Sequence, residues 1–544
     1  MRGAAPPELR AGAAAELARH GGLQVAVLGH RKTTKTAEHL LRAYRRGGAQ
    51  AVHERGDDCT VVVSDEDTGR LILARDFVGA TPLYWGERSG AFAFGTRNCD
   101  VLDALALDRR PERAALAALL VDHAGAALDR TYFQGVRAVP PGCTLVLSQA
   151  GTQLLAASQT QVSPTIDSYA DAVERFRTLL CEAVINRLDS RPPTAVLVSG
   201  GLDSAALLCL AAQHGEVLGI TYGPQDDRSA DESRYIDVLR ATGIPIERTA
   251  FHPTIDAVAL EQSIRQAEMP VGDIVPLTMQ RAKTAAQMRG ARTLLIGTWG
   301  DQVLAPFPPP HLAGLPPWRA AALAARYQRY LADVPVSDVR RALVRQSLRR
   351  RAPGWLLRAR RTRQRRASMF DVLAHEFDAV TARVPDSYAA AVRAHTSDAA
   401  QVHAIAGTTK WGWPAQLDAR LPLLDRELLQ FLMSLPDDVA YHQHRLKPLL
   451  RDALRGVVPD AILERRDKGD YTSAIRRGQL PLTVTLELLE GLRRPVEFGL
   501  MSRRSAAKTL ARLRNGDDIA HHEDDAMMLL SLDIWLRICF QTTP

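Results

Sequence analysis

The residues best suited to carry out chemistry lie in one segment of the chain. They are Ser199, Gly200, Gly201, Asp203 and Ser204, within the letters SGGLDS. Two adjacent glycines allow the backbone to turn sharply and to approach a ligand closely. The aspartate and the second serine stand where a helix is predicted to begin, and the first turn of a helix presents unpaired N–H groups and a partial positive charge. Such a turn suits a phosphate group. The segment therefore predicts a phosphate-binding loop; the alternative is an ordinary glycine turn between a strand and a helix.

The flanking sequence has the pattern needed to position this segment. The apolar run 195–198 predicts a strand that is buried on both faces, and 205–213 contains good helix formers until Gly215 ends the helix. Further strand candidates alternate with helix candidates; the strands are expected at 217–222, 245–251 and 293–296, and the helices at 231–242 and 276–289. This alternation predicts a parallel sheet that binds ligands at the carboxyl ends of its strands.

The letters SGGLDS are identical to the pyrophosphate loop of the ATP-pyrophosphatase families, whose members release pyrophosphate and adenylate their substrate. This resemblance implies that the five residues named above bind ATP. It also implies that the adenine lies over Leu197, Tyr222 and Gly297, which stand near predicted strand ends.

A second motif, TLLIGTWGDQ at 293–302, resembles the LSGEGSDE segment of asparagine synthetases. The resemblance implies that Asp301 and Asp203 together hold Mg²⁺, and two carboxylates plus phosphate oxygens are a ligand set that Mg²⁺ prefers. The alternative for Asp301 is a helix N-cap. Thr298 replaces the family's glutamate or tyrosine near the attacking amine, and Gln302 replaces the final glutamate. Because a threonine cannot act as a general base at neutral pH, another group must take the proton, or the amine must arrive neutral.

Three C-terminal motifs add candidate catalytic residues. LDARLPLLD at 417–425 resembles the family's EARxPFLD and makes Asp418 a candidate base or base-orienting carboxylate, the alternative being a salt bridge to Arg420 or another arginine. KPLLR at 447–451 resembles KxxLR, and RRDKGDY at 465–471 resembles the R.KxGF loop. These two resemblances place Lys447 and Lys468 on the phosphates, where they would offset charge as pyrophosphate leaves. Both lysines could instead be plain surface residues.

The N-terminal part resembles the glutaminase domain of asparagine synthetases. ARDFVGATPLY at 74–84 resembles RDxxGxxPLYY, and GVRAVPPG at 135–142 is similar to the I..lpPG stretch that closes that domain. The family's nucleophile is a cysteine directly after the initiator methionine, whereas this chain has Arg2 there and its first cysteine, Cys59, inside a predicted strand. We therefore expect a domain that does not hydrolyse glutamine and that serves a structural or docking role.

The predicted fold class is a two-domain α/β protein. A degenerate glutamine-amidotransferase-like α+β sandwich is expected at 1–150 and a linker at 151–168. A parallel-sheet α/β ATP-pyrophosphatase domain (adenine nucleotide α-hydrolase-like) with extra helices and an arginine-rich insert at 335–370 is expected at 169–544.

Composition limits the class of protein further. The 544 residues, 46% hydrophobic and 24% charged, are typical of a globular protein with two or more domains. An uninterrupted apolar run of about 18 residues is missing, so no membrane span is expected. The N-terminus lacks the apolar core of a secretory signal, and the six cysteines are scattered without a CxxC pair. These features predict a cytoplasmic protein with reduced thiols and make zinc an unfavoured ligand.

The net charge of +8 is local, because the stretch from Arg340 to Arg366 contains twelve arginines and no acidic residue. Apolar residues at helical spacing within 339–348 predict a helix there, and a solvated helix face would explain the run. The functional alternatives are a landing surface for an acidic peptide or for nucleic acid. Nucleic acid is the weaker of the two, because Trp355 is the one aromatic residue interleaved in the run.

Taken together, the chain resembles the asparagine synthetase B-type superfamily, and the missing glutaminase cysteine is the mark of its β-lactam synthetases and lasso-peptide cyclases. The resemblance implies an ATP-dependent, AMP-forming carboxylate–amine ligase that closes an intramolecular amide, as in macrolactam formation in a lasso precursor peptide. A leader-peptide protease and a leader-binding protein would be its partners. The alternatives are a β-lactam-synthetase-like ligase for a small β-amino acid, a catalytically lapsed peptide-docking protein and an RNA-modifying adenylating enzyme.

Overall fold

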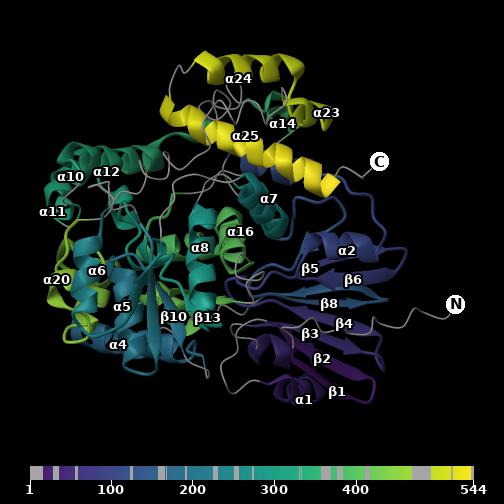
Figure 1. Ribbon diagram of the computed structural model, residues 1–544, viewed down its shortest axis with the longest axis horizontal. Coiled ribbons are helices and arrows are strands. Elements are labelled where there is room, and N and C mark those ends of the chain that lie inside the picture. The colour runs from purple at the N-terminus through teal and green to yellow at the C-terminus, as the bar shows by residue number, and fades with distance from the viewer. Residues whose placement is uncertain are drawn as a thin grey trace.

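The computed structural model describes residues 16–28, 36–55, 59–122, 127–156, 166, 168–189, 193–223, 231–249, 257–271, 275–329, 331, 334–356, 369–376, 384–410, 417–467, 492–515 and 519–540. They form an N-terminal sandwich of two antiparallel sheets and a helix-covered parallel sheet beside it (Figure 1). The two-domain α/β class predicted from the sequence is confirmed.

The N-terminal sandwich has a six-stranded sheet in the order β1-β2-β3-β4-β8-β9 and a three-stranded sheet in the order β6-β5-β7. Side chains alternate along β3: Val61 and Val63 pack in the apolar layer that includes helix α1, and Val62 packs toward Trp85 of the second sheet. Because successive side chains point to opposite faces and both faces are covered, every residue of β3 is buried. The elements are β1 (Glu16–His20), β2 (Leu23–Leu28), α1 (Ala37–Arg55), β3 (Thr60–Asp65), β4 (Arg70–Ala74), β5 (Tyr84–Arg88), β6 (Ala91–Gly95), β7 (Arg137–Ala138), β8 (Thr144–Ser148) and β9 (Gly151–Leu155).

The last strand of this sheet lies where the sequence predicted a linker. Strand β9 pairs with β8 in antiparallel register, from Ser148 opposite Gly151 to Thr144 opposite Leu155. It is an edge strand, and its first four residues are exposed. The N-terminal sheet therefore extends five residues beyond the expected boundary at residue 150.

The parallel sheet that follows the sandwich has five strands in the order β12-β11-β10-β13-β14. Helix α5 packs on β10 and β11, α8 on β11, and α16 on β14. The predicted alternation of strands and helices is present, and β14 is an edge strand that the sequence did not predict. The elements are β10 (Thr194–Val198), α5 (Leu202–Ala212), β11 (Val217–Thr221), β12 (Ile246–Arg248), α8 (Val275–Met288), β13 (Thr293–Leu295), α16 (Ala399–Lys410) and β14 (Asp418–Arg420).

The other helical segments include α2, which packs on β5 and β6 of the sandwich, and the helices that surround the parallel sheet or continue beyond it. They are α2 (Asn98–Ala104), α3 (Arg113–Ala117), η1 (Ala118–Asp122), α4 (Tyr169–Ile185), α6 (Ser233–Arg240), α7 (Ala257–Ala267), α9 (Gly300–Leu304), η2 (Pro310–Gly314), α10 (Pro317–Ala322), α11 (Ala324–Gln328), α12 (Val336–Arg351), α14 (Asp371–Glu376), α15 (Tyr388–Ser397), η4 (Pro422–Leu424), α17 (Arg426–Ser434), α18 (Asp437–Ala440), η5 (His442–His444), α19 (Pro448–Ala453), α20 (Asp460–Leu463), α23 (Arg493–Glu497), α24 (Arg503–Asn515) and α25 (Ile519–Phe540). In the part of the chain that the structure describes, no helix is long and apolar enough to cross a membrane.

One apolar core joins the two halves of the molecule. It contains Phe133 of the N-terminal part together with Trp535 of α25, the helix that crosses the upper part of the molecule in Figure 1. A buried carboxylate strengthens this junction, because Glu268 accepts hydrogen bonds from the backbone N–H groups of Asn98 (2.7 Å) and Cys99 (3.1 Å) at the start of α2. The C-terminal helices therefore hold the N-terminal sandwich against the parallel sheet.

Candidate active site

A pocket lies where the SGGLDS loop (residues 199–204) leaves the parallel sheet, at the carboxyl ends of β10, β11 and β13. Its empty volume is about 1220 Å³, part of it open to solvent. Parallel topology predicts this place for a ligand site. Most of the residues that the sequence assigned to ATP and Mg²⁺ line the pocket: Leu197, Ser199, Gly201, Asp203, Ser204, Tyr222, Gly297, Asp301 and Lys447.

The backbone of the SGGLDS loop is shaped by its own side chains and by one glycine. The Ser199 N–H donates to Ser204 Oγ (3.2 Å), and that hydroxyl donates to the Gly201 carbonyl (3.1 Å). Gly200 has φ +82°, and a Cβ there would lie 3.2 Å from the Cβ atom of Tyr235 in α6. A side chain is therefore disfavoured at Gly200 by both conformation and space.

The start of α5 has the form of an anion site. Gly201 is its N-cap and carries no side chain, so α5 has no side-chain cap hydrogen bond from the described residues. The first N–H groups of a helix have no partner within the helix itself, and they point toward the ligand that binds there. The loop therefore offers phosphate oxygens the donors that a capping side chain would otherwise occupy.

The loop after β13 lies directly against the SGGLDS loop. A Cβ on Gly297 would lie 3.1 Å from the Ser204 backbone nitrogen, and a Cβ on Gly300 would lie 2.1 Å from Asp203 Oδ2. Helix α9 begins at Gly300 and carries Asp301 in its first turn. Two glycines thus allow the loops to approach closely enough to bring the two aspartates together.

One cationic side chain lies between these two aspartates. Lys447 Nζ is 2.6 Å from Asp203 Oδ2 and 2.7 Å from Asp301 Oδ1. Burial alone would lower the pKa of the Lys447 ammonium, but the two carboxylates outweigh burial and raise that pKa above its ordinary value. Lys447 is therefore charged at neutral pH.

The two carboxylates fit a magnesium ion. One oxygen of each lies within 2.7 Å of a single cation, the lysine ammonium, so both can point at one positive centre. Among the described residues no group of three or more His, Cys, Asp or Glu side chains is placed to hold a metal. Asp203 and Asp301 would therefore hold Mg²⁺ together with phosphate oxygens and water, the usual arrangement at nucleotide sites.

Sequence reasoning missed a buried arginine in the pocket wall. Arg465, whose side chain is 5% exposed, donates from Nη1 to the Gly200 carbonyl (2.9 Å) and pairs with Glu232 (2.5 Å). Its guanidinium carbon lies 4.1 Å from the centroid of the Tyr235 ring, and its Nε donates to the Asp467 carbonyl (2.9 Å). Because these contacts fix both the SGGLDS loop and the chain that follows Arg465, this residue positions the site.

We expect Arg465→Lys to raise KM for ATP about tenfold while kcat falls less, because a lysine cannot bond two partners in the fork geometry of an arginine. Pyrophosphate release at varied ATP concentration measures this. Arg234→Lys is the matched control, since Arg234 also pairs with Asp467 (2.6 Å) and also lies over the Tyr235 ring, but its side chain is 68% exposed. Equal KM values in the two variants would contradict the positioning role.

The structure places Asp418 away from the pocket. In the parallel register of β13 and β14, Asp418 is level with Thr293, the first residue of its strand, whereas the pocket lies beyond the last. Its carboxylate pairs with Arg420 (2.7 Å), which in turn donates to the Arg187 carbonyl (2.7 Å). This is the salt bridge that the sequence left as the alternative, so the general base is not assigned to Asp418. Lys468 lies outside the described residues, and its role stays a prediction.

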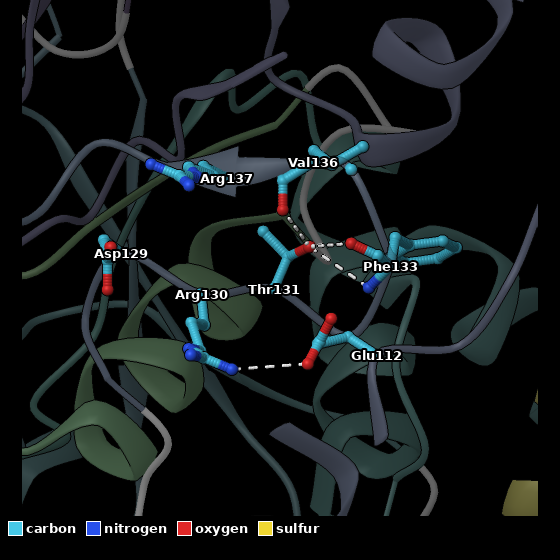
Figure 2. Close-up of a pocket in the computed structure, with 8 residues that line it drawn as sticks. Glu112, Asp129, Arg130, Thr131, Phe133, Val136 and Arg137 are labelled. Atoms are coloured by element: carbon cyan, nitrogen blue, oxygen red, sulfur yellow. Dashed lines mark hydrogen bonds and ion pairs between the residues drawn. The ribbon is translucent and has the colours of Figure 1, made fainter. Parts of the chain in front are cut away.

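A second hollow lies in the N-terminal sandwich (Figure 2), with an empty volume of about 630 Å³. Its polar groups largely satisfy one another: Arg130 pairs with Glu112 (3.3 Å), and Thr131 Oγ donates to the Phe133 carbonyl (3.1 Å). None of the described residues that line it is a cysteine. Cys59 is buried directly before β3, one residue outside the strand in which the sequence placed it.

Comparison with known proteins agrees with this geometry. Residues 175–537 match the family described as asparagine synthase, and residues 23–158 match the glutamine amidotransferase domain. Asparagine synthetase [glutamine-hydrolyzing] 3 of Bacillus subtilis is 22% identical over 485 residues, which cover 80% of this chain and 71% of that protein. Amidase chyE of Penicillium rubens is 24% identical over 335 residues, which cover 57% of this chain and 48% of that protein. The chain belongs to the asparagine synthase family of ATP-dependent, amide-forming enzymes.

Proposed function

We propose that this protein is an AMP-forming carboxylate–amine ligase that adenylates a peptide carboxylate and joins it to an amine of the same peptide. The observation that carries the ligase chemistry is the grouping of Lys447, Asp203 and Asp301 around one point beside the SGGLDS loop. A cation and two carboxylates beside a phosphate-binding turn are suited to binding and cleaving a triphosphate. More specifically, we infer macrolactam formation in a lasso precursor peptide, with a leader-peptide protease and a leader-binding protein as partners.

The reaction has two steps. A carboxylate oxygen of the peptide attacks the α-phosphorus of ATP, the bond from that phosphorus to the bridging oxygen breaks, and pyrophosphate leaves. The amine of the same peptide then attacks the acyl carbon, the acyl–oxygen bond breaks, AMP leaves and the amine loses a proton. Because both ends belong to one bound molecule, the second step is intramolecular and gains from proximity.

The residues of the pocket support the first step. The N–H groups at the start of α5 bind phosphate oxygens, and the Lys447 ammonium offsets the negative charge that develops on the leaving pyrophosphate. Asp203 and Asp301 would hold Mg²⁺, which when bound neutralises further phosphate charge. In the second step Thr298, which lines the pocket, cannot act as a base, so the amine must enter neutral or lose its proton to another group.

Glutamine is not the nitrogen source in this proposal. A glutaminase nucleophile must be an activated thiol that a substrate can reach. Cys59, the cysteine nearest to the N-terminus of the sequence, is buried, and none of the described residues that line the hollow of the sandwich is a cysteine. The Bacillus subtilis relative is named as glutamine-hydrolyzing, so this chain would differ from it in the origin of the amine.

The test is ATP-dependent release of pyrophosphate in the presence of a linear peptide that has a free N-terminus and an internal Asp or Glu. We expect release to be accompanied by the loss of one water from the peptide, measured by mass spectrometry. Asp203→Asn should abolish both signals, since it removes a carboxylate beside the phosphates. Release without water loss would retain adenylation and point to a small β-amino acid as the substrate. If ATP bound but no carboxylate caused pyrophosphate release, the ligase proposal would be contradicted, and the alternative of a docking protein would be left.

A further inference from the structure

Helix α12 has one face that packs on the protein and one that faces solvent. Val339, Leu343 and Ser347 are buried on the inner face, and Ser347 Oγ donates to the Leu315 carbonyl (2.6 Å). Three arginines, Arg341, Arg345 and Arg349, follow one another at a spacing of four residues, and all are exposed. Residues four apart lie on one face of a helix, so these arginines form a single row. The row lies opposite the buried face.

The arginines of α12 differ in what they bind. Arg351 is tied to the preceding loop, since it donates to the Leu315 and Gly314 carbonyls (both 2.7 Å). Arg350 pairs with Asp386 (3.1 Å), and Arg341 pairs with Asp338 (3.1 Å).

Arg345 and Arg349 are exposed and, by contrast with Arg341 and Arg350, form no ion pair with another described residue. The stretch from Arg340 to Arg366 contains no acidic residue at all, so the positive charge of these two arginines is not balanced by their sequence neighbours. Arg345 and Arg349 therefore present positive charge to solvent that no other described residue offsets, and such charge attracts anionic partners.

Large apolar side chains are exposed on α12, directly after it and on a helix that contacts it. Trp318 of α10, a helix that packs against α12, is 67% exposed, and Trp355, just beyond the end of α12, is 65% exposed. Leu348 of α12 is 52% exposed.

We propose that this arginine face, defined as Arg341, Arg345 and Arg349 with Trp318 and Trp355, binds an acidic peptide segment that also carries aromatic or aliphatic side chains. Guanidinium groups bind carboxylates with two parallel hydrogen bonds, and the tryptophans supply apolar contact. The segment is a part of the peptide substrate outside the ring, and this identity rests on the function proposed above. The segment between α11 and α12 contributes Leu331 to the pocket lining, so the helix that carries the arginines follows directly after a part of the active site.

A peptide suits this face better than nucleic acid does. Proteins that bind single strands stack successive bases on a series of aromatic side chains. Here the described part of the face has two exposed tryptophans, on separate elements. The neighbouring pocket activates carboxylates in the reaction proposed above, and a peptide brings that group with it.

Binding of a fluorescein-labelled peptide of glutamates and phenylalanines, followed by anisotropy at low and at physiological ionic strength, tests the arginine face. We expect the double variant Arg345→Glu/Arg349→Glu to weaken binding about tenfold or more at low ionic strength, since like charges replace opposite ones. Arg503→Glu/Arg504→Glu on α24 is the matched control, because these two arginines are also exposed, on a separate helix. The control should bind like the unmodified protein.

The outcomes separate this inference from the proposed function. Equal binding by the two double variants would overturn the arginine face, and so would tighter binding of a single-stranded RNA than of the peptide. ATP–pyrophosphate exchange with a short carboxylate that cannot reach α12 should be unchanged in Arg345→Glu/Arg349→Glu. Loss of that exchange would show that the substitutions act on the pocket and would also overturn the inference. Peptide binding without any ligase activity would contradict the proposed function but would still support peptide binding by the arginine face.

Discussion

Replacing Lys447 by methionine is expected to lower kcat for pyrophosphate release by about two to three orders of magnitude, with a smaller change in KM for ATP. The magnitude follows from removing one preorganised charged group from the place where negative charge develops in the transition state. Methionine keeps most of the length of the side chain, so the change is chiefly one of charge. Lys508→Met on α24 is the matched control, because Lys508 is exposed on another helix, and its kcat should not change.

The same substitution separates two roles of the lysine. Without a ligand, Lys447 neutralises Asp203 and Asp301, whose oxygens lie 2.6 and 2.7 Å from its Nζ. These are also the oxygens that would hold Mg²⁺, and with the metal bound there the Lys447 ammonium would be available to the phosphates. If neutralising the aspartates were its only role, saturating Mg²⁺ would restore kcat in Lys447→Met. We expect saturating Mg²⁺ to correct KM and to leave kcat low.

The SGGLDS loop and its setting were predictable from the sequence because their signals are local. A buried strand, two glycines and a run of helix formers stand within about twenty residues, and each signal concerns neighbours along the chain. The position of Gly200 at φ +82° is the conformation for which a glycine is needed. The same reasoning predicted the helix that carries the arginine row, which the structure shows as α12.

Contacts between distant parts of the chain were not predictable in this way. Arg465 bonds the Gly200 carbonyl across 265 positions, and the letters around Arg465 do not show which backbone group it reaches. Lys447 was assigned to the phosphates by resemblance, whereas its position between two aspartates depends on the packing of two glycine loops. Asp418 lies in a motif that resembles that of the family, but only the strand register shows that it lies at the amino end of β14, away from the pocket.

Strands β9 and β14 escaped prediction because they lack an apolar pattern. Strand β9 has the sequence GTQLL, with four of its five residues exposed, so it does not show the alternation of apolar and polar residues that marks a strand. Strand β14 is three residues long, and two of the three are the charged, half-buried residues Asp418 and Arg420. Edge strands gain their pairing from the neighbouring strand and not from burial of both faces, so composition alone does not distinguish them from loops.

The substitution Gly300→Ala is expected to reduce kcat/KM for ATP about a hundredfold or more, because even a small displacement of a catalytic group lowers the rate by about that factor. A Cβ at this position would lie 2.1 Å from Asp203 Oδ2 and 2.4 Å from Asp203 Cγ, far inside van der Waals contact. Helix α5 holds the backbone of Asp203, so the side chain must rotate. Rotation breaks the contact with Lys447 and removes one of the two carboxylates that would hold Mg²⁺.

Gly314→Ala is the control for this substitution, since a Cβ on Gly314 meets no atom within 4 Å. Steady-state pyrophosphate release and the Mg²⁺ concentration at half-maximal rate are measured for both variants. We expect Gly300→Ala to need more Mg²⁺ and Gly314→Ala to behave like the unmodified protein. Because the clash in Gly300→Ala is with one side chain, its thermal unfolding midpoint should fall far less than its activity. Activity of Gly300→Ala within a few-fold of the control would mean that Asp203 need not hold this position, and the pairing of Asp203 with Asp301 at a metal would lose its support.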